Sequence, residues 1–270
     1  MTWPNLASPD DAYLMGLLQT DGSNHHGKGQ KGAITIELSA RDIRLLERLQ
    51  HVIPCYTSVR RRTRSTNFAT LHESATLTIC DRATRQALEA AGLPAGRKST
   101  SVTPPSGPLA VRDYVRGLVD GDGSIGFTGQ GYPFVSFTTA STALAEFYVA
   151  RLREITAAVR TSRPNARDGV ANVMVTSEPA AVWAAWLYGD AAISLDRKAA
   201  KARELAAWAR PEGMRARPAH GARRWTPEDD QLVLDAGLTQ REIAARLDRS
   251  ISSINARRWR LRNGTSTPAA

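Results

Sequence analysis

The stretch LMGLLQTDG at residues 14–22 and the stretch VRGLVDGDG at residues 115–123 follow one pattern. Each is an apolar run with a glycine near its start, Gly16 or Gly117, and each closes on Asp-Gly at Asp21 or Asp122. Glycine costs about 1 kcal/mol inside a helix, so its repetition predicts a close approach of two helix backbones. We therefore expect the two helices to cross tightly and to bring Asp21 and Asp122 to one place.

The paired aspartates predict a metal site. Helix C-termini carry partial negative charge, and two neighbouring carboxylates repel each other, so a cation is needed to hold them together. Oxygen ligands in a negative field select a hard divalent ion, Mg²⁺ or Mn²⁺, which is suited to phosphodiester hydrolysis. The alternative is that each Asp-Gly is only a turn after a helix. That would suffice for one copy, whereas the same series of elements follows both copies.

The repeated series of elements is α-β-β-α-β-β-α. After the first copy, alternation predicts a strand at 33–40, a helix at 41–53 follows, and then a hairpin and a helix that Asp81 caps. After the second copy, we expect strands, a helix opened by Ser141 or Thr142, two more strands, and two final helices. The ranges are 55–64, 68–79 and 81–93 in the first copy, and 123–131, 133–140, 141–155, 157–162, 170–177, 178–189 and 195–208 in the second.

Linker-like composition divides the chain. We expect a first half at 1–103 and a second half at 104–208, which meet near the Ser-, Thr- and Pro-rich stretch RKSTSVTPPSGP. A basic flexible linker is expected at 209–222, a helical unit at 223–263, and a disordered tail at 264–270.

The doubled motif resembles that of the LAGLIDADG homing endonucleases in their single-chain, two-motif form, over about residues 9–205. The resemblance implies an α+β fold of two pseudo-symmetric αββαββα halves packed through the motif helices. It also implies that each half lays a curved four-stranded antiparallel sheet into the DNA major groove. The family cuts both strands of a long site and leaves staggered ends. Its metal ligands correspond to Asp21 and Asp122.

Two positions depart from the family motif, and two lysines extend the resemblance. Gln19 replaces the usual first acid, which Asp120 keeps, and Thr20 is bulkier than the usual small residue beside the metal. The family often carries a lysine near the site. Lys198 in LDRKAAK and Lys98 in GRKS are the candidates for that catalytic role, the alternative being solvated surface lysines.

Basic residues predict a DNA-contacting surface on the first sheet. Alternation places Arg60, Arg62 and Arg64 on one strand face, with Arg61 on the other, and arginine suits both guanine edges and phosphates. The first hairpin turn carries further candidates for phosphate contacts, namely His25, His26, Lys28 and Lys31. The alternative is a solvated charge run. The two histidines lack a third metal ligand at a suitable spacing.

The C-terminal unit resembles a Myb-like or resolvase-like helix-turn-helix. Thr226-Pro227 predicts a helix start, Thr239 and Glu242 form a capping box, and Ser250 caps a third helix. The recognition helix would span residues 251–261, and Trp225 and Trp259 are expected in the core. The candidate DNA contacts are Ser252, Ser253, Asn255, Arg257, Arg258 and Arg260. The alternative is a helical packing module whose arginines only reflect composition.

Charge and composition restrict the class of protein. A net charge of +10 and a pI near 10.2 favour a polyanionic partner, which we take to be double-stranded DNA. Cys55 and Cys80 stand apart, so neither zinc nor disulfides are indicated. No signal peptide and no membrane-length apolar run is evident, so we expect a cytoplasmic protein. We also expect a monomer. Abundant Ala and Arg suggest a GC-rich bacterial or phage gene.

These features fit two classes of function and exclude a third. A site-specific, metal-dependent DNA endonuclease explains why both Asp21 and Asp122 are present. A non-cleaving transcription regulator or an RNA maturase built on the same fold is the alternative, with RNA as a further partner for a maturase. A binding-only descendant has no reason to keep both acids. Intein splicing is not supported, because no Cys or Ser begins the chain and no His-Asn ends it.

Overall fold

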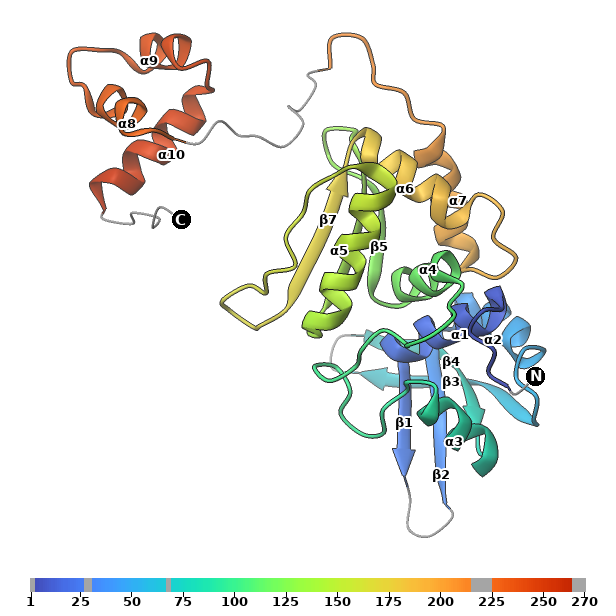
Figure 1. Ribbon diagram of the computed structural model, residues 1–270. Helices are drawn as coiled ribbons and strands as arrows, with labels where there is room; N and C mark the ends of the chain where they lie inside the picture. The colour runs from blue at the N-terminus through green and yellow to red at the C-terminus, as the bar shows by residue number, and fades with distance from the viewer. Residues whose placement is uncertain (1–2, 27–30, 67–68, 215–224, 264–270) are drawn as a thin grey trace. The chain divides into compact units, whose positions relative to one another are not determined.

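The computed structural model describes residues 3–26, 31–66, 69–214 and 225–263, without the side chains of residues 64–66, 69–72 and 252. The chain forms two compact units, Met1–Arg215 and Ala216–Ala270, and each is considered by itself (Figure 1). Parts of the predicted linker and the whole predicted tail, at 215–224 and 264–270, lie outside the described residues.

The first half of unit 1 has the predicted element order. Its four strands form one antiparallel sheet in the order β1-β2-β4-β3, and α2 and α3 pack against that sheet. Asp81 caps α3 as predicted, because its side chain accepts a hydrogen bond from the Thr84 backbone N–H. The elements are α1 (Pro9–Thr20), β1 (Gly22–His26), β2 (Gly32–Ser39), η1 (Ala40–Asp42), α2 (Ile43–Gln50), β3 (Thr57–Thr66), β4 (Ala69–Ile79) and α3 (Arg82–Ala90).

The second half repeats the plan with one strand fewer. Its sheet has three strands, in the order β5-β6-β7, all of them among the described residues. Ser141 caps α5 through the Leu144 N–H, as predicted. The elements are α4 (Val111–Asp122), β5 (Gly123–Phe127), β6 (Pro133–Thr139), α5 (Thr142–Thr156), β7 (Ala171–Thr176), α6 (Glu178–Tyr188) and α7 (Asp196–Ala206).

The prediction of four strands in the second half was wrong, because residues 157–162 form no strand. Ala157 ends α5 in the left-handed conformation, with φ of 56°, and turns the chain away. Arg160 then uses its own Nε to donate to the carbonyl oxygen of Met174 on β7, at 2.7 Å. Asn165 accepts hydrogen bonds from two following backbone N–H groups, which folds residues 165–168 into a local turn. The second half is therefore αββαβαα rather than αββαββα.

The two motif helices, α1 and α4, pack against each other at the centre of unit 1 (Figure 1). Side chains of α1 from Ala12 to Leu18 are buried on every side, as expected for a helix enclosed by protein. A Cβ on Gly16 would lie 2.2 Å from the Tyr114 carbonyl oxygen, and one on Gly117 would lie 2.3 Å from the Tyr13 carbonyl oxygen. The two glycines are thus required by backbone contact, as the repeated pattern predicted.

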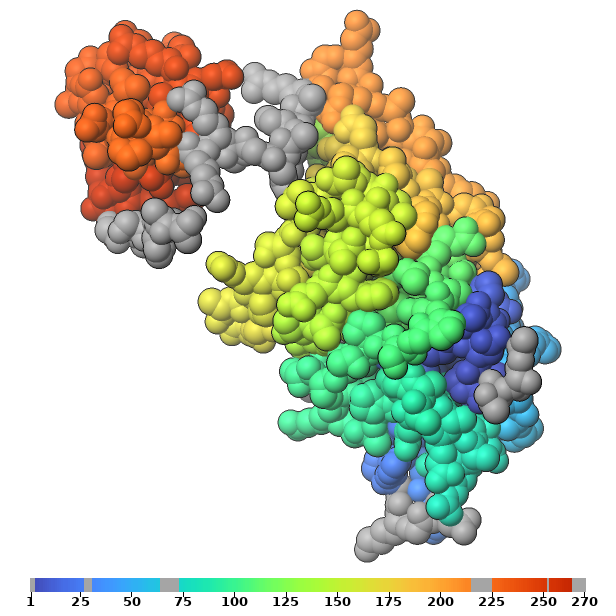
Figure 2. Space-filling model, viewed as in Figure 1, coloured from blue at the N-terminus to red at the C-terminus, as the bar shows by residue number. Residues whose placement is uncertain are grey.

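One apolar core runs through both halves. On the inner face of the first sheet it includes Ile36 and Leu77, and on that of the second sheet Phe137 and Val175, all 0% exposed. Figure 2 shows the two halves joined in one continuous surface. In the part of the chain that the structure describes, no helix has the length and apolar character needed to cross a membrane.

Unit 2 contains α8 (Pro227–Leu234), α9 (Gln240–Arg246) and α10 (Ile251–Arg262). The predicted caps are present: Thr226 and Thr239 each form a capping box, and Ser250 accepts from the Ser253 N–H. Its small core consists of Val233, Ile243, Leu247 and Ile254, against which Trp225 packs. The expectation of a buried Trp259 was wrong, since this residue is 63% exposed.

Candidate metal centre and nucleic-acid interface

Asp21 and Asp122 stand at the C-terminal ends of the two central helices. Asp21 is the residue that ends α1, and its N–H donates to the Leu17 carbonyl oxygen at 3.0 Å. Asp122 is the last residue of α4 and is followed directly by β5. Because α1 and α4 cross at their glycines, the ends of both helices lie on the same side of the crossing. Each aspartate thus joins a motif helix to the first strand of its sheet.

The electrostatics join these two aspartates in one site. Burial, and secondly repulsion by the Asp122 carboxylate, raises the pKa of Asp21 to about 6. Partial burial of the carboxylate also raises the pKa of Asp122, whereas the positive charges of Lys98 and Lys198 lower it. The residue as a whole is nevertheless exposed to solvent. The two carboxylates repel each other, and the ammonium groups of Lys98 and Lys198 offset their negative charge. The four groups therefore form one charged cluster.

Lys98 and Lys198 occupy matching places beside the helix ends. The Nζ of Lys98 donates to the carbonyl oxygens of Gln19 and Thr20, both at 2.8 Å. The Nζ of Lys198 donates to the carbonyl oxygens of Val119, Asp120 and Gly123 at 2.7–2.8 Å. Burial lowers the pKa of both lysines, that of Lys198 to about 8. Neither is a solvated surface lysine, since each is buried and satisfies the last carbonyls of a motif helix.

Gln19 and Asp120 lie at equivalent motif positions but differ in their hydrogen bonds: Asp120 only accepts, whereas Gln19 both accepts and donates. Asp120 only accepts: it takes bonds from the hydroxyls of Tyr13 and Tyr188 and from the Leu195 N–H, at 2.6–2.8 Å. Gln19 accepts from the Tyr114 hydroxyl and donates through Nε2 to the carbonyl oxygens of Gly92 and Thr103. Each motif helix thus donates a tyrosine hydrogen bond to the other helix. Gln19 suits its position because its amide NH₂ can donate to the two carbonyl oxygens there.

Thr20, the second departure from the motif, fits because its counterpart is glycine. A Cβ on Gly121 would lie only 2.0 Å from Thr20 Oγ1. The Thr20 hydroxyl itself donates within its own helix, toward the carbonyl oxygens of Gly16 and Leu17. The bulk of Thr20 therefore fills the space that Gly121 leaves open across the helix crossing, and it points along α1 rather than between the aspartates.

The two carboxylates fit a hard divalent cation. Both are oxygen donors in a partly desolvated place, and a cation would relieve the repulsion that raises the pKa of Asp21. Among the described residues, no three acidic, histidine or cysteine side chains gather as a complete metal cage. Water and phosphate oxygens would therefore have to supply the remaining ligands, which is the usual arrangement for Mg²⁺.

The first sheet has an arginine-bearing face opposite its core. Arg60 pairs with Thr76 and Arg62 with Ser74, while Arg61 pairs with Ala75, which is 0% exposed. Opposed residues of antiparallel strands share a face, so Arg60 and Arg62 lie together and Arg61 lies on the other face, as alternation predicted. The Arg64 side chain lies outside the described residues.

The predicted hairpin residues have different surroundings. His25 and Lys31 are exposed at the two sides of the β1–β2 connection, and Lys28 lies outside the described residues. The His26 ring is paired with Glu89 of α3, so it links α3 to the sheet.

The candidate DNA contacts of unit 2 also divide into two groups. Arg257 makes two 2.7 Å bonds to Asp230, and Arg258 donates to the Val233 carbonyl oxygen, so both link α10 to α8. Asn255 and Arg260 are exposed, and Ser253 is half-buried. The Ser252 side chain lies outside the described residues.

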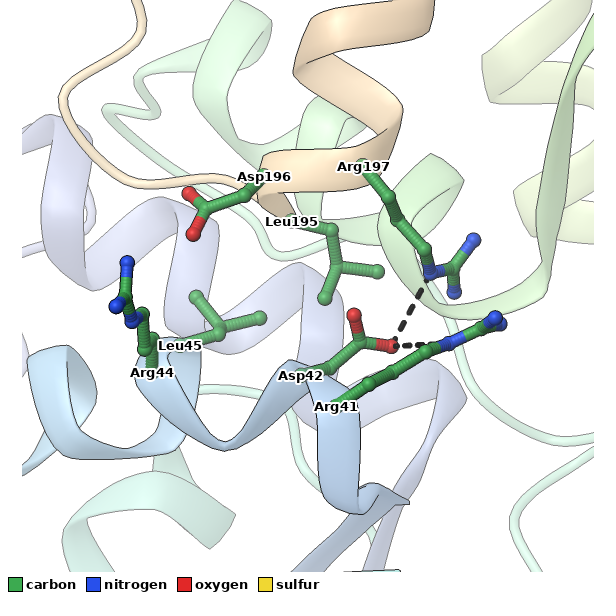
Figure 3. A pocket seen from close by; sticks show the side chains of 7 residues that line it. All are labelled: Arg41, Asp42, Arg44, Leu45, Leu195, Asp196 and Arg197. Carbon is green, nitrogen blue, oxygen red and sulfur yellow. Dashed lines mark hydrogen bonds and ion pairs between the residues drawn. The ribbon is translucent and has the colours of Figure 1, made fainter.

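Ion pairs between the halves, which sequence reasoning missed, hold the start of α7 (Figure 3). Arg197 donates to Asp42 at 3.1 Å, and Asp196 pairs with Arg48 of α2. They border a cavity of about 260 Å³ between η1, α2 and α7, lined in part by Arg41 and Arg44. Partners 148 and 155 positions apart leave no signal in a single sequence. Because Lys198 follows Arg197, these pairs fix the helix that delivers Lys198 to the aspartates.

Comparison with known proteins gives the fold. No family model matches the sequence, and no curated protein matches it. Among solved structures, the meganuclease I-SmaMI bound to uncleavable DNA is 12% identical with a TM-score of 0.50, covering 74% of this chain and 87% of that one. A mesophilic variant of the homing endonuclease I-DmoI is 15% identical with a TM-score of 0.49, covering 74% of this chain and 100% of that one.

The N-terminal LAGLIDADG domain of WhiA is also similar, at 10% identity and a TM-score of 0.46, covering 72% of this chain and 88% of that one. At these identities the likeness concerns the fold alone. The fold of this chain is that of the meganuclease I-SmaMI, and it is the LAGLIDADG fold that the doubled motif predicted.

Proposed function

We propose that this chain is a site-specific endonuclease that hydrolyses phosphodiesters in both strands of a DNA duplex. The observation that carries the proposal is the electrostatic pairing of Asp21 with Asp122 at the joined ends of α1 and α4. A site between two pseudo-symmetric halves suits a duplex, whose two strands are also related by an approximate twofold axis. The net charge of +10 supports a polyanionic substrate.

Asp21 and Asp122 would hold Mg²⁺ or Mn²⁺, which when bound neutralises charge on the phosphate and favours deprotonation of water. In the reaction, water loses a proton to solvent as its oxygen adds to phosphorus, the bond from phosphorus to the leaving sugar oxygen breaks, and that oxygen gains a proton from solvent. By holding that ion, the Asp21 and Asp122 carboxylates would position the scissile phosphate. Neither carboxylate is itself the nucleophile.

Lys98 and Lys198 would hold Asp21 and Asp122 in place. Their hydrogen bonds to the final carbonyls of α1 and α4 fix the ends from which the aspartates project. Their positive charge also favours the ionised form of both carboxylates, which is the form that binds a cation. We therefore assign both lysines to the catalytic site, with Lys198 the more completely bonded of the two.

Unit 2 would be a second DNA contact of the helix-turn-helix type. Its three short helices, capped as the sequence predicted, present exposed Asn255 and Arg260 on α10. A tethered second contact raises the effective concentration of the catalytic unit at its site. With this unit the chain would act as a monomer on a long asymmetric target.

The experiment is a cleavage-site selection from a randomised duplex library in Mg²⁺, with binding to the selected site measured separately. Wild type should cut both strands at one site. Asp21→Asn and Asp122→Asn should each lower cleavage at least about 100-fold while binding persists. Asp190→Asn, an exposed aspartate paired with Arg112, serves as the matched control and should cut normally.

Specific binding by wild type without any nicking would contradict the endonuclease proposal and favour a DNA-binding regulator. Cutting by Asp21→Asn and Asp122→Asn at the wild-type rate would contradict the assignment of the site.

A further inference from the structure

We propose that the two halves of unit 1 read half-sites of different base composition. The first sheet selects guanines, and the second sheet selects A·T pairs through small polar and apolar contacts. This inference rests on the proposed function, because it assumes that the outer face of each sheet meets the DNA major groove. It goes further by assigning to this chain a target with guanines in one half-site and A·T pairs in the other.

The first sheet has a hydrogen-bonding outer face that carries positive charge. Register places Arg60 in one cross-strand row with Thr76 and Glu37, and Arg62 in the next row with Ser74 and Ser39. Both arginines are exposed, and neither has a hydrogen-bond or ion-pair partner among the residues that the structure describes. Their guanidinium groups are therefore available to a ligand without breaking an existing contact.

The second sheet differs completely in charge. Its strands read GSIGF, PFVSFTT and ANVMVT, with no Lys, Arg, His, Asp or Glu in any of them. On the face opposite Phe137 and Val175, one row contains Ser124, Ser136 and Met174. The next residues on this face are Phe134, Thr138, Asn172 and Thr176.

The apolar members of this face are accessible. Met174 is 46% exposed on the edge strand β7, and Phe134 is half-buried with its ring over Gly126, where a Cβ would lie 3.2 Å from Phe134 Cε1. Arg160, in the segment that lies along the β7 edge, donates hydrogen bonds to the Met174 and Val159 carbonyl oxygens. The face thus presents methyl, thioether, ring, hydroxyl and amide groups.

These two sets of groups match different bases. Arginine makes two hydrogen bonds to O6 and N7 of guanine, the commonest specific contact in the major groove. Asparagine makes two to N6 and N7 of adenine, and apolar groups contact the thymine methyl. An uncharged face also leaves the guanine acceptors without their strongest donors. We therefore assign guanine selection to Arg60 and Arg62, and A·T selection to Asn172 and Met174.

The test is a binding selection of the full-length chain on a randomised duplex in EDTA, followed by base-preference measurements with variants. Arg60→Ala and Arg62→Ala should each reduce discrimination by about 10- to 100-fold at guanine positions of one half-site. Arg61→Ala is the matched control, because it removes the same charge from the same strand on the opposite face. It should leave base preference unchanged.

Asn172→Ala and Met174→Ala should relax preference only at A·T positions of the other half-site. Val182→Ala, which removes an exposed apolar side chain from α6, is the control for Met174. The inference is overturned if Arg60→Ala and Arg62→Ala weaken all sequences equally, since the arginines would then contact phosphates alone. It is also overturned if the positions that respond to Asn172 and Met174 are G·C pairs.

Failure of this inference differs from failure of the proposed function. A selected site that is rich in G·C on both sides, and that is cut in Mg²⁺, overturns the half-site assignment and leaves the endonuclease intact. If no sequence is enriched at all, both the assignment and the site-specific function are wrong.

Discussion

Gln19 and Asp120 show at the scale of single residues how one motif position can serve two chemistries. Two hydroxyls, from Tyr13 and Tyr188, and a backbone N–H surround Asp120, and a carboxylate accepts from all three. One hydroxyl, from Tyr114, and two carbonyls surround Gln19, and the carbonyls require the amide NH₂ of glutamine. The departure of Gln19 from the family motif is therefore matched to its surroundings.

Replacing Gln19 by the motif's usual acid should destabilise the protein. Gln19→Asp, and the isosteric Gln19→Glu, would place a carboxylate against the carbonyl oxygens of Gly92 and Thr103 and leave both without a donor. We expect a loss of about 2–4 kcal/mol in the free energy of unfolding, measured by urea denaturation. Gln130→Glu makes the same change in an exposed turn and should have little effect. Equal stability of Gln19→Glu and wild type would refute this account.

The raised pKa of Asp21 predicts a pH-dependent cost of folding. Because the pKa rises from 3.8 to about 6, the folded chain binds more protons than the unfolded chain between pH 4 and pH 6. Stability therefore decreases as pH rises through that window, and the full cost is present above pH 6. Asp21→Asn removes this cost, so without divalent ions it should exceed wild type by about 1–2 kcal/mol at pH 8, after allowance for solvent screening.

At pH 4 the two proteins should be nearly equally stable, and Mg²⁺ at pH 8 should raise the melting temperature of wild type more than that of Asp21→Asn. Glu47→Gln, an exposed change on α2, should show none of this pH dependence. A wild type that is more stable than Asp21→Asn at pH 8 in EDTA would contradict the assigned cause.

Single residues differ in how far the sequence could predict them. Gly16, Gly117, Asp21 and Asp122 were predictable because each pair repeats at the same place in the two copies. The repeat could not predict the role of Arg197, because its partner Asp42 lies in the other half. The exposure of Trp259 was also missed, because residue type alone does not tell which side of a short helix faces the core.

At the scale of elements, the crossing of α1 and α4 depends on matched volumes as well as on two glycines. Thr20 and Gly121 occupy equivalent positions, and the threonine projects into the space that the glycine leaves. Close-packed interiors tolerate an exchange of volumes better than an addition.

A double-mutant cycle tests this match. Gly121→Ala would place its Cβ 2.0 Å from Thr20 Oγ1 and 2.6 Å from Thr20 Cβ, so we expect a loss of about 3 kcal/mol or more. Thr20→Gly removes both atoms and should restore most of that loss in the double variant, measured by chemical denaturation. Gly129→Ala is the control, since no atom lies within 4 Å of its Cβ. Additive losses in the double variant would show that the two positions are independent.

Elements were predictable where local chemistry decides them and were missed where it does not. Asp81, Ser141, Thr226, Thr239 and Ser250 cap helices as predicted, because a cap needs only residues three positions away. The segment 157–162 was predicted as a strand, yet a strand also needs a partner edge. The carbonyl of Met174 on the β7 edge bonds to the Arg160 side chain.

At the scale of the whole molecule, the two compact units predict separable contributions to binding. A chain ending at residue 215 should cut at the same position as the full chain, and its affinity for DNA should be about 10- to 100-fold lower. Full-length Ile254→Asp is the matched control: it keeps the linker but places a charge in the small core of unit 2, so it should resemble the truncation. Unchanged affinity in both proteins would refute a DNA-binding role for unit 2.

The asymmetry between the halves appears only at this scale. The repeat predicted two similar halves, whereas the second sheet, within the described part of the chain, has three strands and no charged residue in any of them. The helices that build the shared site are held by symmetry-related contacts, while the surfaces around it are free to differ. The division between a repeated centre and divergent sheets supports the proposal of an asymmetric target.

The central claim is that Asp21 and Asp122, from opposite halves, share one divalent-ion site against DNA. Anomalous diffraction from crystals of the full chain bound to its selected duplex in Mn²⁺ tests it most directly. We predict an anomalous peak within coordination distance, about 2.0–2.6 Å, of a carboxylate oxygen from each aspartate and of the phosphate backbone. An ordered complex with DNA in place and no anomalous peak at either aspartate would contradict the claim.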